Sequence, residues 1–302
     1  MACCKIDLMK IAIVSPSAPS THTAARTQQY ESGLATLKSL DFECQEMPHT
    51  RDSLSYVSSN TNNRINDLGL AYEDPGVKLI VTANGGWNVS HLLANFPYEL
   101  AAKNPKKMVG ASDITLLLNA IYAKTGVSQI YGPMVTWGFE NNNAETNQSF
   151  LALVKNGQQE IAISNFGTWL KPGKLNGISV GGNLIAIAGL LGTPYEPEWT
   201  NKIFVWEEVY EPLHSLDRAL TYFKNAGVWD KIAGMVIGHL HGIDENFAGK
   251  TSSTDQMIAE HFAGYDFPIL KTKLFGHEIP TQISLPIGGT ITADDKVFTS
   301  RF

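Results

Sequence analysis

Cysteine is scarce in this 302-residue sequence, which contains only Cys3, Cys4 and Cys44. Two adjacent cysteines and one distant cysteine form neither a disulfide framework nor the C-x-x-C pair of a zinc site. Incidental, reduced thiols are typical of a cytoplasmic protein. We therefore expect a cytoplasmic location, no metal and no cofactor.

Long apolar runs and an excess of basic charge are also missing. No run approaches the ~18–20 apolar residues that span a bilayer. Near the N-terminus, Asp7 and Lys10 interrupt the apolar stretch that a secretory signal would need. The formal charge is -6 at pH 7, and the sequence lacks the basic stripe of a nucleic-acid binder. We expect neither a membrane nor a nucleic acid among the partners.

Short apolar runs alternate with helical patterns through the first half of the chain. The run VKLIVTA at 77–83 is typical of a strand buried on both faces of a parallel sheet. Such alternation predicts βαβ units, and so a doubly wound α/β domain over residues 1–145. The predicted strands are 10–15, 42–47, 77–83 and 107–110, and the predicted helices are 28–40, 63–72, 89–94 and 114–124.

The pattern changes after an asparagine-rich region at 141–147, where we expect a turn. The stretch 165–182 contains Pro172 and five glycines, so residues 146–182 are predicted to be a linker or loop. Residues 183–302 are predicted to form a smaller α+β domain rich in strands. Its predicted helices are 184–191, 215–226 and 255–262, and its predicted strands are 202–207, 234–238, 269–274, 282–285 and 289–293.

The sequence GASDIT at 110–115 places a serine in a tight turn between a strand and a helix. Such a turn exposes the hydroxyl of Ser112 as a nucleophile, and the backbone N–H of Asp113 points to where an oxyanion would form. The alternative is that Ser112 is only the N-cap of the helix. The motif also departs from G-x-S-x-G, because Ile114 replaces the second glycine.

A pair of glycines, Gly85 and Gly86, follows the predicted strand at 77–83. Loops at the carboxyl ends of parallel strands bind ligands in open α/β sheets, and glycine lets backbone N–H groups approach a charged group. A plain turn is the alternative. A dinucleotide site is not indicated, because the G-x-G-x-x-G fingerprint is missing.

Two further strand ends carry residues that could act with a nucleophilic serine. Glu207 ends the apolar run IFVW, where a carboxylate is costly unless it is paired, so it is a candidate to orient a histidine. His277 lies beside Gly276 and has room to rotate. The alternatives are a solvated carboxylate at Glu208 and a loop histidine with a structural role.

His239 and His241 form an H-x-H pair on a predicted strand, where both imidazoles would lie on one face. No third ligand follows at a recognisable spacing, so a metal site is the weaker interpretation.

Taken together, these segments resemble the LD-carboxypeptidase and microcin C immunity family of serine peptidases. The resemblance runs over nearly the whole chain, and the order of its segments is more specific than any single motif. The segments that carry it are the glycine loop at 84–88, GASDITLLLNAIYAKTGVSQIYGP at 110–133, GGNL at 181–184, FVWEEV…LDRAL at 204–220 and LFGHE at 274–278.

The resemblance implies a Ser–Glu–His triad of Ser112, Glu207 and His277. It also implies an oxyanion hole formed by the backbone N–H groups of Gly86 and Asp113. The implied fold is a flavodoxin- or Rossmann-like N-terminal half with a parallel sheet and a smaller, strand-rich C-terminal half, with the site in the cleft between them. Family members are commonly cytoplasmic dimers, so a homodimer is expected.

The implied activity is amide hydrolysis by nucleophilic acyl transfer, with a small peptide or a peptidyl- or aminoacyl-nucleotide as substrate. LD-carboxypeptidase action on the C-terminal D-amino acid of a muropeptide is the first hypothesis. Hydrolysis of aminoacyl-nucleotide amides, as in the immunity branch, is the second. A non-catalytic module that binds a peptide or nucleotide is the alternative from another class.

Substrate contacts are assigned to four side chains, and Lys273 is a further candidate cation for the substrate carboxylate. In the immunity branch, aromatics of a loop before GGNL stack on a nucleotide base. The corresponding stretch here, 164–181, contains only Phe166 and Trp169 as aromatics. The four assigned contacts are Trp87, Asn88, Trp169 and Arg218.

Overall fold

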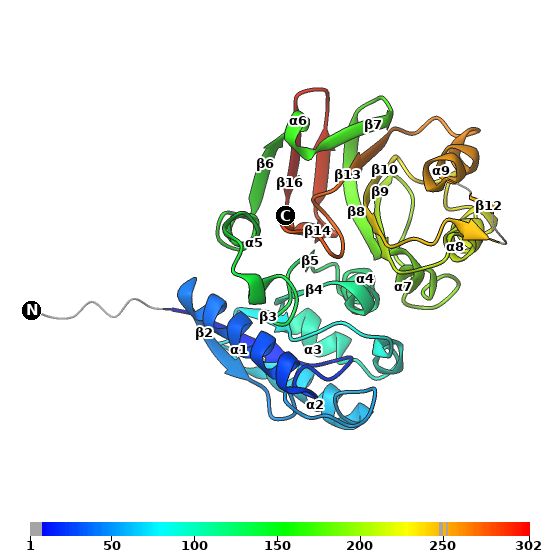
Figure 1. Cartoon of the computed structure of the whole chain (residues 1–302). Helices are drawn as coiled ribbons and strands as arrows, with labels where there is room; N and C mark the ends of the chain where they lie inside the picture. Colours follow the sequence, from blue (N-terminus) through cyan, green and yellow to red (C-terminus); the bar gives the residue numbers. More distant parts are fainter. Residues whose placement is uncertain (1–7, 248–249, 252) are drawn as a thin grey trace, which may run out of the picture.

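The computed structural model describes residues 8–247, 250–251 and 253–302. Cys3 and Cys4 lie outside these residues. Two large sheets form the framework of the described residues, one mainly from the first half of the chain and one from strands that follow residue 157 (Figure 1). The α/β fold with a strand-rich second half is the predicted fold class. Within the described residues, no helix is both long and apolar enough to cross a membrane.

The first sheet has the strand order β14-β5-β4-β3-β1-β2. Its first five strands in the chain are parallel, and β14 joins antiparallel to β5. The second half of the chain therefore contributes one edge strand to the first sheet. The strands are β1 (Met9–Val14), β2 (Phe42–Glu46), β3 (Leu79–Thr82), β4 (Lys107–Gly110), β5 (Gln129–Tyr131) and β14 (Leu285–Ile287).

Both faces of the first sheet are covered, as the apolar runs predict. In β1, Ile11 and Ile13 pack into one core cluster, whereas Ala12 and Val14 belong to the cluster on the other face. The helical segments of this half are α1 (Ala24–Ser39), α2 (Thr61–Glu73), η1 (Val89–Leu92), α3 (Tyr98–Lys103), η2 (Ser112–Ile114), α4 (Thr115–Thr125), η3 (Phe139–Asn141) and α5 (Ala144–Asn156).

The second sheet has the order β6-β16-β15-β8-β9-β10-β13-β7. Its central strands β8, β9, β10 and β13 are parallel, and the outer strands join them antiparallel. These strands are β6 (Gln158–Ala162), β7 (Gly167–Lys171), β8 (Leu175–Asn183), β9 (Lys202–Val209), β10 (Gly234–His241), β13 (Ile269–Thr272), β15 (Thr290–Ala293) and β16 (Val297–Arg301).

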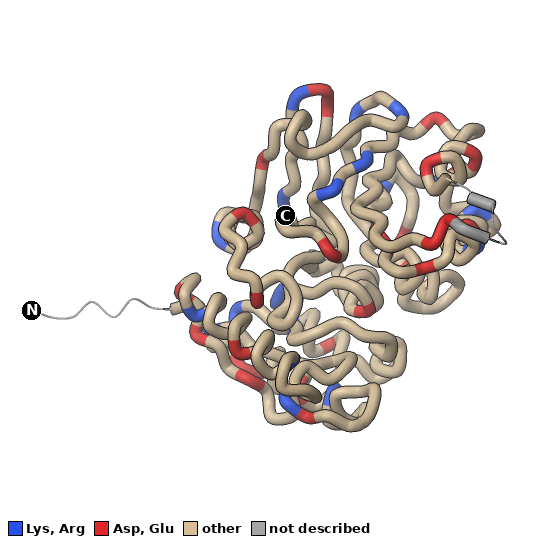
Figure 2. The backbone as a smooth tube through the Cα atoms, in the orientation of Figure 1, with Lys and Arg blue, Asp and Glu red and all other residues tan. Residues whose placement is uncertain are grey.

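Short helices and a hairpin complete the second half. α4 of the first half contacts both β8 and α7, so it packs between the two halves (Figure 1). Lys and Arg are interspersed with Asp and Glu over the described part of both halves (Figure 2), in line with the predicted lack of a basic stripe. The remaining elements are α6 (Ile163–Phe166), α7 (Leu184–Ala188), α8 (Leu213–Asn225), α9 (Thr254–Phe262), β11 (Asn246–Phe247) and β12 (Lys250–Thr251).

The prediction of a linker or loop at 146–182 is wrong, because most of α5, then β6, α6, β7 and most of β8 lie there. Glycine in β8 allows the neighbouring strand to approach closely, because a Cβ at Gly181 would lie only 1.9 Å from the carbonyl oxygen of Val205 in β9. The turn predicted at 141–147 is also wrong in its second part, where α5 begins with Asn143 as its N-cap. The division of the chain at residues 145 and 183 stays a prediction.

Candidate active site

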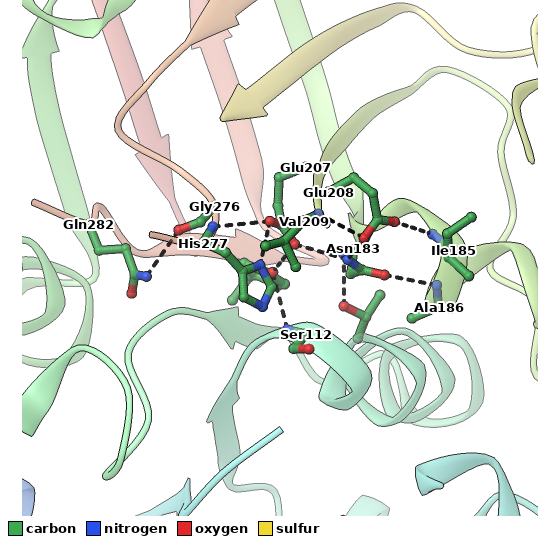
Figure 3. Close-up of polar contacts among 12 residues, drawn as sticks. Ser112, Asn183, Ile185, Ala186, Glu207, Glu208, Val209, Gly276, His277 and Gln282 are labelled. Carbon is green, nitrogen blue, oxygen red and sulfur yellow. Dashed lines mark hydrogen bonds and ion pairs between the residues drawn. The ribbon is translucent and has the colours of Figure 1, made fainter. Parts of the chain in front are cut away.

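Three strand ends bring the predicted catalytic residues to the junction of the two sheets. Ser112 follows β4 of the first sheet, Glu207 lies near the end of β9, and His277 follows β13 of the second sheet. Figure 3 shows Glu207 and His277 above Ser112, which begins the helical segment that leads into α4. Residues about 70 to 165 positions apart in the sequence thus come together where strand ends of the two sheets meet.

Ser112 has a strained backbone. Its φ is 57°, in the left-handed region that residues other than glycine rarely adopt. Among the hydrogen bonds of the described residues, none involves Ser112 Oγ, so the hydroxyl does not cap the helix. This geometry is that of a sharp strand-to-helix turn that exposes a serine hydroxyl, and it disfavours the simple N-cap alternative.

The glycine loop lies directly against Ser112. A Cβ built at Gly85 would lie 2.8 Å from Ser112 Cβ and 3.1 Å from its Oγ, so a side chain there would crowd the hydroxyl. Gly86 has a φ of 149°, and a Cβ there would lie 2.4 Å from Ser17 Oγ. Both positions therefore require glycine, which favours the ligand-binding interpretation of this loop over a plain turn.

The carboxylate of Asp113 fixes this loop beside the serine. Its Oδ2 accepts hydrogen bonds from Ser17 Oγ at 2.5 Å, from the Asn88 N–H at 2.8 Å and from the Val89 N–H at 2.9 Å. The backbone N–H groups of Gly86 and Asp113 donate to no other group among the described residues. They are free to bind an oxyanion, and their assignment to an oxyanion hole stays a prediction.

Glu207 and His277 form a buried, hydrogen-bonded pair. The Glu207 side chain is fully buried, and its Oε2 accepts from His277 Nδ1 at 2.6 Å and from the His277 N–H at 3.1 Å. Burial alone would raise the pKa of Glu207, but His277 and the surrounding hydrogen bonds outweigh it and lower that pKa. Burial would likewise lower the pKa of His277, but the Glu207 charge raises it overall.

Tyr131 connects this pair to the serine. Its hydroxyl donates to Glu207 Oε1 at 2.7 Å and accepts the N–H of Ser112 at 3.2 Å. Burial and the Glu207 charge raise the pKa of Tyr131 well above its usual value, so it remains a donor. Among the described hydrogen bonds, none joins Ser112 Oγ to His277. The structure therefore links the two through Tyr131 and Glu207.

A second carboxylate, Glu208, lies buried next to Glu207. Asn183 Nδ2 donates to Glu208 Oε1 at 2.7 Å and lies 3.4 Å from Glu207 Oε1, so it bridges the two acids. The Ile185 N–H donates to Glu208 Oε2 at 2.9 Å. Burial and the neighbouring Glu207 charge raise the pKa of Glu208 to about 7, so Glu208 is not the solvated carboxylate that the sequence suggested.

The substitution Glu208→Gln tests the raised pKa of Glu208 through its effect on stability. The Glu208 carboxyl has a pKa of about 4.3 in the unfolded state and about 7 in the native state. Between these pH values the native state binds more protons than the unfolded state, so the free energy of unfolding falls as the pH rises. Glutamine does not titrate, so the variant lacks this pH-dependent loss of stability. From pH 4 to pH 8, the free energy of unfolding of Glu208→Gln should rise relative to wild type by up to about 3 kcal/mol. Urea unfolding across this range measures it, and a pH-independent difference contradicts it.

The predicted substrate contacts lie at different places. Trp87, on the glycine loop, is 81% exposed and free to contact a ligand. Asn88 is buried and accepts a hydrogen bond from Arg64 Nη1 at 2.7 Å, so its side chain holds the loop. Trp169 lies on the edge strand β7, half-buried against the core, and Arg218 is an exposed residue of α8. Their roles in substrate binding stay predictions.

The remaining candidates from the sequence are the histidine pair, Phe166 and Lys273. The rings of His239 and His241 lie 5.5 Å apart at the end of β10, but no group of three potential metal ligands occurs among the described residues. Phe166 is buried and stacks on Phe298 with ring centroids 3.8 Å apart, so its ring has no free face for a nucleotide base. Lys273 is exposed beyond β13.

Tyr131 and Asn183 are parts of this site that were not predicted from the sequence, although both lie in segments that carry the family resemblance. The strand that ends at Tyr131 was not predicted, since it has only three residues. Its place next to β4 in a parallel sheet is the signal that could have located the tyrosine beside Ser112. Asn183 was hidden because β8 was expected to be a loop.

Two domains of one known protein family match this chain, one in each half. The LD-carboxypeptidase N-terminal domain matches residues 11–132, and the LD-carboxypeptidase C-terminal domain matches residues 176–293. The first match contains Ser112 and the glycine loop, and the second contains Glu207 and His277. The resemblance seen in the sequence is thus confirmed.

Individual relatives agree. The probable murein peptide carboxypeptidase of Bacillus subtilis is 27% identical over 284 residues, covering 92% of this chain and 86% of that protein. A putative carboxypeptidase of Treponema pallidum is 33% identical over 278 residues, covering 83% and 80%. The structure of the microcin C7 self immunity protein MccF in complex with aspartyl sulfamoyl adenosine has a TM-score of 0.88 at 25% identity, covering 97% and 96% of the two chains.

Proposed function

The chain belongs to the LD-carboxypeptidase family, and on that premise we propose that it is a serine peptidase that removes the C-terminal D-amino acid of a muropeptide. The observation that carries the proposal is the buried pair of Glu207 and His277, 2.6 Å apart, at the strand end above a strained Ser112. A carboxylate that orients an imidazole beside a serine is the arrangement used to activate a hydroxyl for acyl transfer.

In the proposed mechanism, Ser112 Oγ attacks the carbonyl carbon of the terminal amide while His277 Nε2 takes the hydroxyl proton. The imidazolium then gives that proton to the leaving amine, and an acyl-enzyme remains. Water hydrolyses the acyl-enzyme by the same route. Glu207 fixes the His277 tautomer with the Nδ1 proton and stabilises the imidazolium, and the N–H groups of Gly86 and Asp113 bind the oxyanion.

Tyr131 has a positioning role in this proposal. Its hydroxyl donates to the Glu207 oxygen that His277 does not use, so it keeps the carboxylate in place and stabilises its charge. The same hydroxyl accepts the N–H of Ser112, which supports the strained turn. The strain at Ser112 is thus held by a contact within the first half, and the bond from Tyr131 to Glu207 ties this turn to the second half.

The raised pKa of His277 predicts a shifted pH profile. As a general base the imidazole must be neutral, so kcat/KM should rise with pH around a midpoint above the ordinary histidine value of about 6.5. In Glu207→Gln the carboxylate charge is gone and burial lowers the pKa, so the midpoint should fall. NMR titration of the His277 ring in both proteins, beside the kcat/KM profile, measures this. Equal midpoints would contradict the assigned partnership.

A substrate panel tests the proposed function. The purified protein is incubated with the tetrapeptide L-Ala-D-Glu-L-Lys-D-Ala and with its all-L isomer, and release of alanine is followed by mass spectrometry. Release of D-alanine from the first peptide alone supports LD-carboxypeptidase action. Binding of the peptide without any release supports the non-catalytic module instead.

Hydrolysis of aminoacyl-nucleotide amides is the second candidate. The similarity to MccF, whose structure is described with aspartyl sulfamoyl adenosine, favours it. The burial of Phe166 disfavours it, because Phe166 is one of only two aromatic residues in the stretch 164–181 and its ring stacks on Phe298. Adding aspartyl sulfamoyl adenosine to the panel separates the two candidates.

A cytoplasmic location and a homodimer, both implied by the family resemblance, are part of the proposal in either case.

A further inference from the structure

A buried arginine of α2 joins the glycine loop to a second loop. Arg64 is 3% exposed, and its Nη1 donates to the Pro16 carbonyl at 2.8 Å and to Asn88 Oδ1 at 2.7 Å. Pro16 follows β1 and Asn88 follows β3, and these two strands are neighbours in the first sheet. One guanidinium group therefore holds both loops at this edge of the sheet. No step of the proposed mechanism uses Arg64.

The burial of Arg64 is energetically costly. Burial lowers the pKa of Arg64, and the Asp113 charge opposes this only in part. The Nε of Arg64 is also buried and has no hydrogen-bond partner in the described part of the chain. An apolar side chain would fill the same space without a desolvated charge or an unpaired donor. This cost indicates that Arg64 is needed for its hydrogen bonds rather than for packing.

The carboxylate of Asp113 holds the same two loops through other atoms. Its Oδ2 accepts the Asn88 N–H at 2.8 Å and the Ser17 hydroxyl at 2.5 Å. Asn88 is thus fixed at its backbone by Asp113 and at its side chain by Arg64. Because Ser17 directly follows Pro16, both charged groups tie the loop after β1 to the loop after β3.

The peptide group between Gly85 and Gly86 depends on the relative position of these loops. The Ala18 N–H donates to the Gly85 carbonyl at 3.0 Å, and the peptide is trans. In a trans peptide the carbonyl and the following N–H point in opposite directions, so the Gly86 N–H points away from Ala18. A peptide between two glycines meets little steric resistance to reversal, so outside contacts must hold it in one orientation. A reversed peptide would present its carbonyl oxygen where the oxyanion needs a donor.

We propose that Arg64 is a positioning residue that keeps the Gly86 N–H directed at the oxyanion. Through the Pro16 carbonyl it holds the loop that carries Ala18, and through Asn88 it holds the end of the glycine loop. The peptide that contains the Gly86 N–H is then fixed from both loops. The inference rests on the proposed function and adds to it a residue of α2, outside the triad, that controls one oxyanion donor.

Two substitutions of Arg64 test this role through kinetics. Arg64→Met removes both hydrogen bonds and should lower kcat by about 10²-fold, comparable to the loss of one oxyanion donor, with KM changed less than about threefold. In Arg64→Lys the shorter side chain keeps the charge but reaches only one of the two oxygens, so kcat should fall by about tenfold.

The matched control is Lys106→Met, which removes another buried cation that holds α2. Lys106 Nζ donates to the backbone carbonyls of Ala71, Tyr72 and Asp74 at the C-terminal end of this helix. Lys106→Met should therefore lower the free energy of unfolding and leave kcat unchanged. A folded Arg64→Met protein that behaves in the same way would show that Arg64 is merely structural, and would overturn the proposal.

The orientation of the Gly86 N–H is measured directly by its residual dipolar coupling in protein labelled with ¹⁵N-glycine. The wild-type coupling should fit the structure, whereas Arg64→Met should change it and leave the coupling of Gly227, in the second half, as it is. A Gly86 coupling unaffected by the substitution would overturn the proposal. If Arg64→Met does not fold, Arg64→Lys decides by the same two readouts. The couplings need no activity, so a wild type that cleaves no peptide would overturn the proposed function alone.

Discussion

Replacing Ser112 with alanine should lower kcat by at least about 10³-fold, because the acyl-enzyme can no longer form. Substrate binding should persist, since the Gly86 and Asp113 N–H groups and the peptide subsites are unchanged. The fold should also persist, because alanine keeps the Cβ and the Ser112 hydroxyl has no hydrogen bond among the described residues. Single-turnover kinetics by mass spectrometry and thermal unfolding of both proteins measure these outcomes.

The matched control is Ser90→Ala, which removes an exposed hydroxyl in η1 and should leave kcat unchanged. Undiminished turnover of a well-folded Ser112→Ala protein would refute the nucleophile. A loss of activity accompanied by unfolding would instead show that the serine supports the turn, and Ser112→Gly would then distinguish the two roles. Glycine relaxes the positive φ of 57° while removing the hydroxyl, so it should give a stable, inactive protein.

Glu207→Gln should have the second largest effect, a fall in kcat of roughly 10³–10⁴-fold with little change in structure. Glutamine keeps the shape of the side chain, but it cannot carry the charge that stabilises the His277 imidazolium. Its amide also offers an N–H where His277 Nδ1 and the Tyr131 hydroxyl need acceptors, so the imidazole is expected to take the wrong tautomer.

Steady-state kinetics at pH 8, with thermal unfolding as the check on the fold, measure the effect of Glu207→Gln. The control is Glu43→Gln, an exposed carboxylate on β2, which should retain wild-type kcat. A tenfold effect or less in a folded Glu207→Gln protein would mean that the buried pair is structural rather than part of the proton transfer.

The sequence predicted most of the first half, because long apolar runs and helical periodicity act over neighbouring residues. Each predicted strand of that half, such as 77–83, overlaps an observed strand, here β3. The errors occur where pairing with distant strands decides the structure. The glycines of β8 suggested a loop, but they allow close contact with β9, as at Gly181 and Val205. Edge strands such as β7 have weak patterns of their own.

In the candidate site, too, local patterns were predictable from the sequence and contacts between distant residues were not. Local motifs made Ser112, Glu207 and His277 candidates, because each lies at or just after the end of an apolar run, and the family resemblance implied that they form a triad. The links between them could not be predicted, since the contact of Tyr131 with Glu207 joins residues 76 positions apart across two sheets. The roles of Asn88 and Asp113 in holding the glycine loop likewise depend on distant backbone atoms.

The most direct test of the account is a double-mutant cycle on Ser112 and His277. If the two side chains act as one unit, removing the second should lower kcat no further once the first has been removed. The kcat of Ser112→Ala/His277→Ala should therefore equal that of the slower single variant within a few-fold. Losses that multiply in the double variant would show that Ser112 and His277 act independently, and would contradict a shared proton transfer.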